Sequence, residues 1–392
     1  MQITDVNAYL VESDAPISEY GVNGWLIVTI ETDTGLRGIG EAGAWAYLET
    51  AAQAVERFEP SLLGKNPLRR EHHLQYLSRS AHFRGAGITS ALSAIDIALW
   101  DIAGKHYDAP IYELLGGLCR DKLRTYAHVI GGTTDEVVEK CRECKAEGFT
   151  AIGHLSPLLD ESRNESYGET HAGMIADAAD RVRRFREAVG DGVDLCIEIH
   201  RRLDPHQAIS LAREIEQYRP MFYEDPIRPD NPDAMKKVAD NTIIPIATGE
   251  RFQTVEEFNA LLRRDAVDYV RPDLCLAGGL TGAKKIAALA EANYVDVVPH
   301  DPLGPVSTAA CIQLAASIPN FAIQEYPYRP EHDQAPGESL LEEPFEWSDG
   351  YLSVPEGPGL GIEIDDDVLE AGSYEQPELS TRLHEDGSVV DQ

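Results

Sequence analysis

The sequence has little positive charge. It contains 34 lysine and arginine residues, only nine of them lysine, against 67 aspartate and glutamate residues, and its formal net charge is -33. The acidic residues are dispersed along the chain, so we expect the charge to cover the surface. Because this field repels phosphate groups, we expect no nucleic-acid partner and no anionic membrane as a partner. The charge fits either a moderately acidic mesophilic protein or a protein from a halophile, where molar salt screens self-repulsion within a few ångströms, and we favour the halophile.

Long apolar runs are also lacking. No run of 18 apolar residues occurs, and residues 1–6 lack the basic and apolar regions of a signal peptide. We therefore expect a soluble, cytoplasmic protein. The six cysteines are spread over the chain, which favours reduced thiols over a disulfide framework. Cys141 and Cys144 form a CxxC pair inside a charged helical stretch, and without a second pair we interpret this spacing as chance.

The chain is long for one ordinary core. Its 392 residues favour a large barrel with a second, smaller lobe. Residues 25–32 and 37–42 are strand-like, and residues 88–101 form a helical stretch with small and apolar residues on nearly every face. Strands followed by helices predict an α+β lobe over residues 1–120, which ends near the glycine-rich break at 115–117.

From residue 121 to residue 328, short apolar segments alternate with amphipathic helical stretches. This alternation is what a TIM-type barrel requires, and a doubly wound open sheet is the alternative. A segment rich in proline, glycine and acidic residues follows over 329–392, and we expect it to return and pack on the first lobe. The eight predicted strands are residues 125–129, 150–152, 193–199, 221–223, 244–248, 269–271, 295–298 and 321–324.

Three short apolar runs end in a carboxylate at equal intervals. Glu198, Glu224 and Glu250 follow one another at steps of 26 residues. A strand, a loop and a covering helix need about that much chain, so the three acids are expected at the ends of successive parallel strands, facing one another. Mg²⁺ prefers such oxygen ligands. The spacing therefore predicts one Mg²⁺ per subunit in a barrel.

Two histidines lie at the same predicted strand ends. His200 is two residues beyond Glu198, so its side chain would point the same way, as a neighbour of the metal or as a structural histidine. Asp273 and His300 close the sixth and seventh strands and could form a pair in which the aspartate fixes the tautomer of a general base. A metal with these groups suits removal of the proton α to a carboxylate by His300. With His200 as the acid for a departing β-hydroxyl, the sum is a dehydration.

Several motifs follow one another in a specific order over nearly the whole chain. The ordered set resembles the enolase superfamily, specifically its mandelate racemase branch and the galactonate- and gluconate-type sugar-acid dehydratases within it. The resemblance implies an α/β fold, a modified TIM barrel (β/α)7β, with an α+β capping domain formed by the N-terminal lobe and the C-terminal segment. The motifs are Gly35-Leu36-Arg37-Gly38-Ile39-Gly40-Glu41, Tyr223-Glu224-Asp225-Pro226, Ala247-Thr248-Gly249-Glu250-Arg251, Pro272-Asp273, Ala277-Gly278-Gly279-Leu280-Thr281, Pro299-His300-Asp301-Pro302-Leu303-Gly304-Pro305 and Gly359-Leu360-Gly361-Ile362-Glu363-Ile364.

The resemblance also implies roles for individual residues. It places Mg²⁺ on the same three glutamates and makes His300 with Asp273 the base. It makes Glu325, in the eighth strand, a donor to the substrate carboxylate or to the intermediate. Oligomers are usual in this family, so we expect a homo-oligomer, either a dimer or an octamer.

Two departures from the family pattern are informative. Racemases and cycloisomerases of the family carry Lys-x-Lys at the end of the second barrel strand, whereas this chain has Gly153-His154-Leu155 there. The missing lysines argue against a base on each face and favour one-sided abstraction. Glu198-Ile199-His200 resembles the Asp-x-His of galactonate-type dehydratases, with a longer acid in the first position. The longer side chain shifts the carboxylate by about one C–C bond and so affects the geometry of the predicted metal site. We still expect His200 to act as the acid.

Substrate choice is expected to depend on loops that the first lobe extends over the barrel mouth. We assign substrate contacts to Tyr20, Asn23 and Trp45 in these loops, and to His154 and Arg251 on the barrel. His154 could equally be a spectator. Polar and aromatic groups suit a polyol chain, but they do not separate galactonate from gluconate, xylonate or arabinonate.

The sequence thus predicts an Mg²⁺-dependent hydro-lyase that converts an aldonic acid, a small-molecule acid sugar, to its 2-keto-3-deoxy derivative. One alternative is a racemase or epimerase of a 2-hydroxy acid with His200 and His300 as its two bases. The other is a non-catalytic relative that binds sugar acids.

Removal of salt is expected to destabilise the protein, because the self-repulsion of its surface is then screened less. We expect the thermal unfolding temperature to fall steadily as KCl is lowered from about 3 M to about 0.1 M. Calorimetry or circular dichroism measures it, with a sucrose series as the control for general crowding. Full stability at low ionic strength would contradict the halophilic interpretation.

Overall fold

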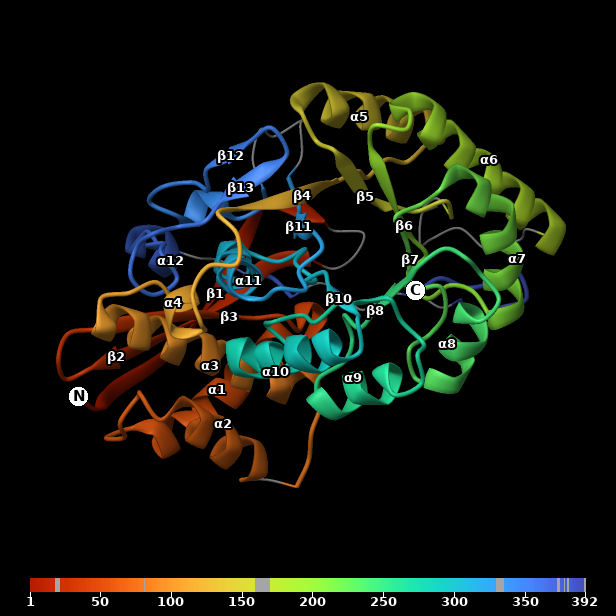
Figure 1. Cartoon of the computed structure of the whole chain (residues 1–392). Coiled ribbons are helices and arrows are strands. Elements are labelled where there is room, and N and C mark those ends of the chain that lie inside the picture. Colours follow the sequence, from red (N-terminus) through yellow and green to blue (C-terminus); the bar gives the residue numbers. More distant parts are fainter. Residues whose placement is uncertain are drawn as a thin grey trace.

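The computed structural model describes residues 1–17, 22–80, 82–158, 170–328, 335–371, 374–376, 378 and 381–390. The N-terminal lobe is a cap that begins with a three-stranded antiparallel sheet of β1 (Ile3–Ile17), β2 (Val22–Thr32) and β3 (Arg37–Ala42). The two predicted strands of residues 25–32 and 37–42 are therefore confirmed and pair with each other, and β1 was not predicted. Four helices follow, α1 (Leu48–Leu62), α2 (Arg70–Arg79), α3 (Ala86–Tyr107) and the short α4 (Ile111–Leu114) (Figure 1).

Helix α3 packs directly on the cap sheet because two glycines of β3 leave room for it. A Cβ atom at Gly40 would lie 1.9 Å from the carbonyl oxygen of Ala94, and one at Gly38 would lie 2.1 Å from that of Ala98. The helix is buried on nearly every face, as its small residues predict. It is the one helix of the described residues long and apolar enough to cross a membrane, and 78% of that apolar window is buried inside the protein.

The second lobe is a closed barrel of parallel strands that pair in chain order. The eighth strand returns to the first, with Gln324 opposite Thr125, and a bridge between Val297 and Phe321 closes the remaining gap. This closure excludes the open sheet. The barrel strands are β4 (Lys122–His128), β5 (Ala151–Leu155), β6 (Asp194–Glu198), β7 (Phe222–Glu224), β8 (Ile246–Thr248), β9 (Tyr269–Val270), β10 (Asp296–Val297) and β11 (Gln324–Tyr326).

The last strand lies later in the sequence than predicted. Residues 321–323 are apolar and resemble a strand, but Phe321 makes only a single bridge, and the ladder with β4 runs from Gln324 to Tyr326. The barrel stagger decides this, because the eighth strand must pair with β10 and β4 at different heights.

One helix follows each of the first seven barrel strands, which gives the (β/α)7β arrangement. Side-chain caps explain where several begin: Thr133, Thr170, Asn231 and Thr254 each accept a backbone N–H of the first turn. The seven helices are α5 (Thr134–Glu147), α6 (His171–Val189), α7 (Pro205–Ile215), α8 (Pro232–Ala239), α9 (Val255–Leu262), α10 (Gly279–Ala292) and α11 (Pro305–Ser317).

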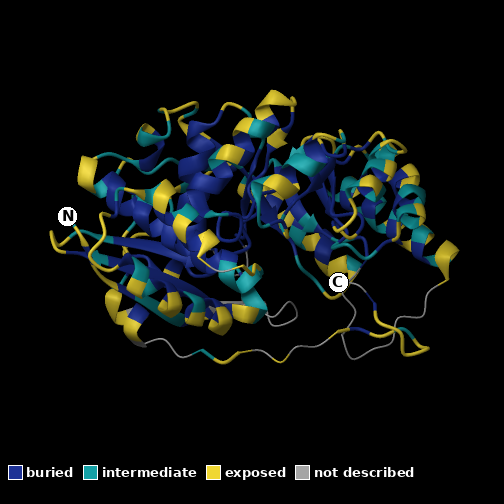
Figure 2. Ribbon diagram, turned by 90° about the horizontal axis from the view of Figure 1, so that it is seen from below, coloured by how far each residue is buried: buried dark blue, intermediate teal, exposed yellow. Residues whose placement is uncertain are grey.

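The buried apolar residues form separate cores in the barrel lobe and in the cap. The barrel interior is a small cluster that includes Tyr126, Cys196 and Phe222, and a much larger core fills the space between the strands and the surrounding helices. A separate core joins the cap sheet to α1 and α3. Figure 2 shows the buried strands inside and the exposed residues on the outer helix faces. All six cysteines are free thiols.

The C-terminal segment contacts both lobes. Strand β13 (Tyr351–Ser353), paired with β12 (Trp347–Ser348), adds to the start of β4 with Tyr351 opposite Arg124. Further on, the backbone N–H of Leu360 donates to Asp101 of α3 at 2.9 Å. Helix α12 (Asp366–Ala371) follows, and Asp366 pairs with Arg37 of β3 at 2.5 Å.

Two buried acids of the cap bind the barrel. Asp96 on α3 accepts hydrogen bonds from the backbone N–H of Thr281 at 2.9 Å and from its hydroxyl at 2.7 Å, at the start of α10. Glu41 in β3 accepts the N–H groups of Gly304 at 2.7 Å and Ser307 at 2.9 Å, at the start of α11. Burial raises the pKa of Asp96 and that of Glu41 to about 7 each.

Replacement of Asp96 by asparagine is expected to change how stability depends on pH. Between the ordinary pKa of 3.8 and the folded pKa of about 7, the folded protein keeps a proton on Asp96 that the unfolded chain has lost. The stability that the protonated acid contributes is therefore lost as the pH rises, by about 2 kcal/mol between about pH 5.5 and pH 7. Over this range the unfolding free energy of the wild type should fall relative to that of Asp96→Asn, as denaturant titrations at constant salt can measure. A difference that stays constant with pH would contradict this assignment.

Candidate active site at the barrel mouth

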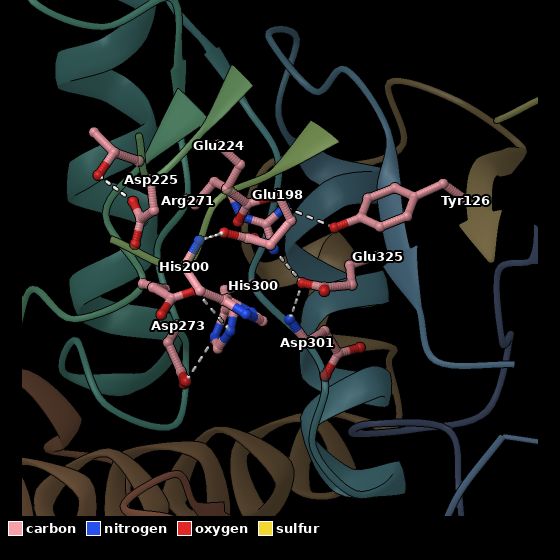
Figure 3. A network of polar contacts seen from close by, with 12 residues as sticks. Tyr126, Glu198, His200, Glu224, Asp225, Arg271, Asp273, His300, Asp301 and Glu325 are labelled. Carbon is pink, nitrogen blue, oxygen red and sulfur yellow. Dashed lines mark hydrogen bonds and ion pairs between the residues drawn. The ribbon is translucent and has the colours of Figure 1, made fainter. Parts of the chain in front are cut away.

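Three glutamates meet where the barrel strands end. Glu198 ends β6, Glu224 ends β7, and Glu250 lies just after β8. Strands β6 and β7 pair Glu198 with Glu224, and Glu198 shares the inward side of its strand with Cys196 of the barrel interior. One carboxylate oxygen of each glutamate lies within 4.8 Å of the other two. Figure 3 shows Glu198 and Glu224 side by side at the strand ends.

Burial and mutual repulsion control the charge of this carboxylate cluster. Burial, followed by repulsion from Glu250 and Asp225, raises the pKa of Glu198 to about 8. Burial also raises the pKa of Glu224 well above its usual range. A shared cation would allow all three to ionise together. Their hard oxygen atoms suit Mg²⁺, which takes a few carboxylates and leaves its other positions to water and substrate, so the residues present fit this ion.

Two arginines flank the cluster. Nε of the buried Arg271 lies 2.6 Å from Oε1 of Glu224, although the two are not aligned as a hydrogen bond. On the other side, Nη1 of Arg201 contacts Oε1 of Glu250 and lies 3.3 Å from Oδ2 of Asp225. Burial opposes the ionisation of Glu250, but Arg201 and His300 outweigh it, and the pKa of Glu250 is lowered.

His300 and Asp273 lie together beside the cluster (Figure 3). Nδ1 of His300 is 3.1 Å from Oδ2 of Asp273, and Nε2 is 3.4 Å from Oε2 of Glu250. The backbone N–H of Cys275 donates to Oδ1 of Asp273 at 2.7 Å and holds the carboxylate in place. Burial disfavours the imidazolium, but Glu250 and the hydrogen bond to Asp273 outweigh it and raise the pKa of His300. Nε2 is therefore the ring nitrogen that faces the carboxylates.

His200 lies in a strained turn directly after β6. His200 and Arg201 have φ angles of 53° and 67°, in the left-handed region that non-glycine residues rarely adopt. Glu198 stabilises the turn, because its Oε1 accepts the backbone N–H of His200 at 2.7 Å. Burial, followed by His154 and Arg201, lowers the pKa of His200 well below its usual range.

A row of imidazoles extends from His200 across the first strands of the barrel. The ring of His154 lies edge-on to His200 with centroids 4.7 Å apart, and it stacks on His128 at 5.0 Å. His154 also has a left-handed backbone, with φ at 52°. At the far end, Nε2 of His128 is 2.7 Å from Oε1 of Glu325.

A cavity of about 610 Å³ opens beside His300 and Glu250. Trp45, in the short helix η2 (Trp45–Tyr47) of the cap, lines it and lies tilted against His300 with ring centroids 5.9 Å apart. Arg201 and the exposed Arg251 also line it. Of the other predicted substrate contacts, Tyr20 lies outside the described residues, and Asn23 lies in a part of β2 whose side chains the structure does not describe.

Three residues at the mouth had no role assigned from the sequence. The sequence could have indicated Arg271, because an arginine before Pro272-Asp273 at a strand end faces the predicted acids. Nothing in the sequence indicated His128, because a buried histidine is usually a satisfied core residue. Nothing indicated Arg201 either, because its place in the site depends on the left-handed turn.

The chain matches two family descriptions in sequence. Residues 17–116 match the mandelate racemase/muconate lactonizing enzyme N-terminal domain, and residues 136–368 match the enolase C-terminal domain-like family. The D-galactonate dehydratase of Xanthomonas oryzae pv. oryzae (strain PXO99A) is 34% identical over 379 residues, which cover 94% of this chain and 96% of the relative. The D-galactonate dehydratase of Ralstonia pickettii (strain 12J) is 36% identical over 379 residues, which again cover 94% of this chain and 96% of the relative.

Solved structures agree with this relationship. An enolase from Agrobacterium radiobacter, bound to sodium and L-malate, superposes with a TM-score of 0.90 at 29% identity and covers all of both chains. A mandelate racemase/muconate lactonizing enzyme from Jannaschia sp. CCS1 has a TM-score of 0.85 at 31% identity over 97% of this chain and 100% of the other. The chain therefore belongs to the mandelate racemase/muconate lactonizing enzyme family of the enolase superfamily.

Magnesium is expected to stabilise the folded protein, because it binds the folded carboxylate cluster and not the unfolded chain. Glu224→Gln removes one ligand charge and should weaken Mg²⁺ binding by about tenfold or more, as calorimetric titration can measure. Glu256→Gln, at an exposed acid of α9 outside the cluster, is the matched control. Equal Mg²⁺ binding by the two variants would contradict a metal site at these glutamates.

Proposed function

We propose that the protein is an acid-sugar dehydratase, an Mg²⁺-dependent hydro-lyase that converts an aldonic acid to its 2-keto-3-deoxy derivative. The carrying observation is the His300–Asp273 pair, whose free ring nitrogen lies 3.4 Å from a carboxylate of the predicted metal site. His200 lies just after β6, the strand that ends in the predicted metal ligand Glu198. Relatives named D-galactonate dehydratase support a sugar acid as substrate. D-Galactonate is therefore the first compound to test, before gluconate, xylonate and arabinonate.

His300 removes the proton from C2 of the substrate. Asp273 accepts the Nδ1–H, which leaves the lone pair of Nε2 directed toward the carboxylate cluster, where the substrate carboxylate would lie. Mg²⁺, when bound to Glu198, Glu224 and Glu250, supplies positive charge that stabilises the negative charge developing on the substrate carboxylate.

His200 completes the reaction as the acid. Its lowered pKa makes the neutral ring the resting form, so it takes up a proton once the anionic substrate lies beside it, and the resulting imidazolium is a strong acid. It donates this proton to the departing C3 hydroxyl, which leaves as water, and the resulting enol takes up a proton at C3 to give the 2-keto acid. Glu198 accepts the backbone N–H of His200 and so holds the left-handed turn that carries this imidazole just after β6. At the end of β5, His154 replaces the family's lysine pair, which supports abstraction from one face only.

The cavity suits the rest of the substrate. Its volume of about 610 Å³ accommodates a six-carbon acid, and Trp45 and Arg251 offer an aromatic face and hydrogen-bond donors to a polyol chain. Tyr20, Asn23 and His154 stay predicted contacts. The homo-oligomer, the cytoplasmic location and the halophilic source also stay predictions.

Replacement of His300 by asparagine is expected to lower kcat by about 10²–10⁴-fold, because the general base is lost. The assay follows keto-acid formation from a panel of acid sugars with Mg²⁺ at high salt. His206→Asn, on the exposed side of α7, is the control for loss of a histidine elsewhere. Intact turnover in His300→Asn would rule out the mechanism.

The same assay in D₂O separates the alternatives. A dehydratase releases the keto acid, with deuterium incorporated at C3. Deuterium at C2 without loss of water would favour the racemase or epimerase, and binding of a sugar acid without either change would favour a non-catalytic relative.

A further inference from the structure

Arg201 lies in the strained turn after β6, the strand that ends in Glu198. Its φ angle of 67° is in the left-handed region, which glycine adopts freely and an arginine adopts only with strain. Its backbone N–H donates to the carbonyl oxygen of Asp225, directly after β7, at 2.8 Å. Strain of this kind persists only where the surrounding contacts determine the conformation, so the contacts of the arginine side chain indicate its role.

The guanidinium of Arg201 contacts acids from the two neighbouring strand ends. Nη1 contacts Oε1 of Glu250, just after β8, and lies 3.3 Å from Oδ2 of Asp225. The side chains of Asp225, Glu250 and Arg201 are 1%, 9% and 14% exposed, so water screens these contacts little. One nitrogen atom from the turn after β6 therefore joins the ends of β7 and β8.

Asp225 extends the same contacts to the last residue of β8. Its Oδ1 accepts the hydroxyl of Thr248 at 2.5 Å. Thr248 ends β8 two residues before Glu250, and Asp225 directly follows Glu224 at the end of β7. Each of the three strands that lead to a predicted metal ligand thus contributes one residue to this group. We call Arg201, Asp225 and Thr248 the clamp.

We propose that Arg201 is a positioning residue of the metal site, which orients Glu250 and, through the clamp, holds the three ligand strand ends together. This inference rests on the metal site of the proposed function. Carboxylates that bind a metal are themselves held by hydrogen bonds from residues outside the ligand set, and loss of such a partner weakens metal binding. Arg201 is this partner for Glu250, because its Nη1 engages Oε1 and restricts rotation of the carboxylate.

The positive charge of Arg201 has an opposite effect on a cation. If repulsion between the guanidinium and the metal dominated, removal of Arg201 would strengthen Mg²⁺ binding. If orientation of the ligand dominates, removal weakens Mg²⁺ binding. The guanidinium faces the two carboxylates of Glu250 and Asp225, which offset much of its field at the cluster, so we expect orientation to dominate. The sign of the change in affinity separates the two effects.

The test compares Mg²⁺ affinity in Arg201→Met and in the wild type by calorimetric titration. The variant removes the guanidinium, and we expect its Mg²⁺ affinity to fall by about 10–100-fold. Arg228→Met is the matched control, because Arg228 follows β7, is 54% exposed and pairs with Asp204 outside the clamp. At high salt its Mg²⁺ affinity should stay within about twofold of the wild type. Circular dichroism without Mg²⁺ checks that both variants are folded.

A second variant keeps the test valid if Arg201→Met does not fold. Loss of the guanidinium leaves the buried Asp225 without its counter-charge, which destabilises the folded protein. Arg201→Met combined with Asp225→Asn removes both charges, and its Mg²⁺ affinity should fall by a similar factor, because Glu250 still lacks its partner. Asp225→Asn alone keeps the contact between Arg201 and Glu250 and should lose less affinity than the double variant.

Unchanged or stronger Mg²⁺ binding in the folded Arg201→Met protein, or in the double variant, would overturn the proposal. Unchanged Mg²⁺ affinity with a raised KM for the acid sugar would assign Arg201 to substrate binding instead. Failure of the wild type to bind Mg²⁺ would refute the metal site and the clamp's role with it. Mg²⁺ binding by the wild type without dehydration of any acid sugar would refute the proposed function alone, because calorimetry of the metal needs no substrate.

Discussion

The mouth of this barrel is organised by the repulsion among three carboxylates, of which Glu198 and Glu224 are buried and Glu250 is partly buried. Two unit charges 4.8 Å apart repel each other by roughly 3 kcal/mol at an effective dielectric constant of about 20. Burial makes the cost larger, because each carboxylate also loses water. Two arginines partly offset this repulsion with positive charge. Arg271 approaches from inside the barrel, and Arg201 approaches from the cavity side. The pKa values of Glu198 and Glu224 nevertheless stay raised, so full ionisation of the cluster needs a further positive charge, which a divalent cation would supply.

Four of the nine non-glycine residues with a positive φ angle among the described residues lie at this barrel mouth. His154, His200, Arg201 and Asp225 all have positive φ angles and all follow or end barrel strands at the mouth. A contact with the neighbouring strand end holds the turn after β6: the N–H of Arg201 donates to the carbonyl of Asp225 at 2.8 Å. Strain of this kind persists only where neighbouring contacts determine the conformation, and it is common at active sites. At Arg201 the turn accompanies a guanidinium that contacts Glu250 of the cluster.

The cap contributes to the chemistry by position as well as by contact with the cavity. Gly43 follows β3, and a Cβ atom there would lie 3.1 Å from Oδ1 of Asp273. The cap turn therefore lies directly against the Asp273–His300 pair. Trp45 follows two residues later against His300. The buried Asp96 and Glu41 bind the cap to the N-termini of α10 and α11, the helices that follow the Asp273 and His300 loops. Cap and barrel therefore position the Asp273–His300 pair together.

The sequence by itself determined the class of fold and the three metal-binding candidates, because both depend on regular spacing. Alternating strands and helices predict the barrel, and acids at steps of 26 residues fall at successive strand ends whatever the loops do. Pairing of Asp273 with His300 followed from the same regularity. The register of the eighth strand, the left-handed turn at Arg201 and the position of His128 beside Glu325 were decided only in the tertiary structure. These features depend on barrel stagger, on strain compensated by distant contacts and on charges brought together from strands far apart in the chain, and no local pattern of residues records them.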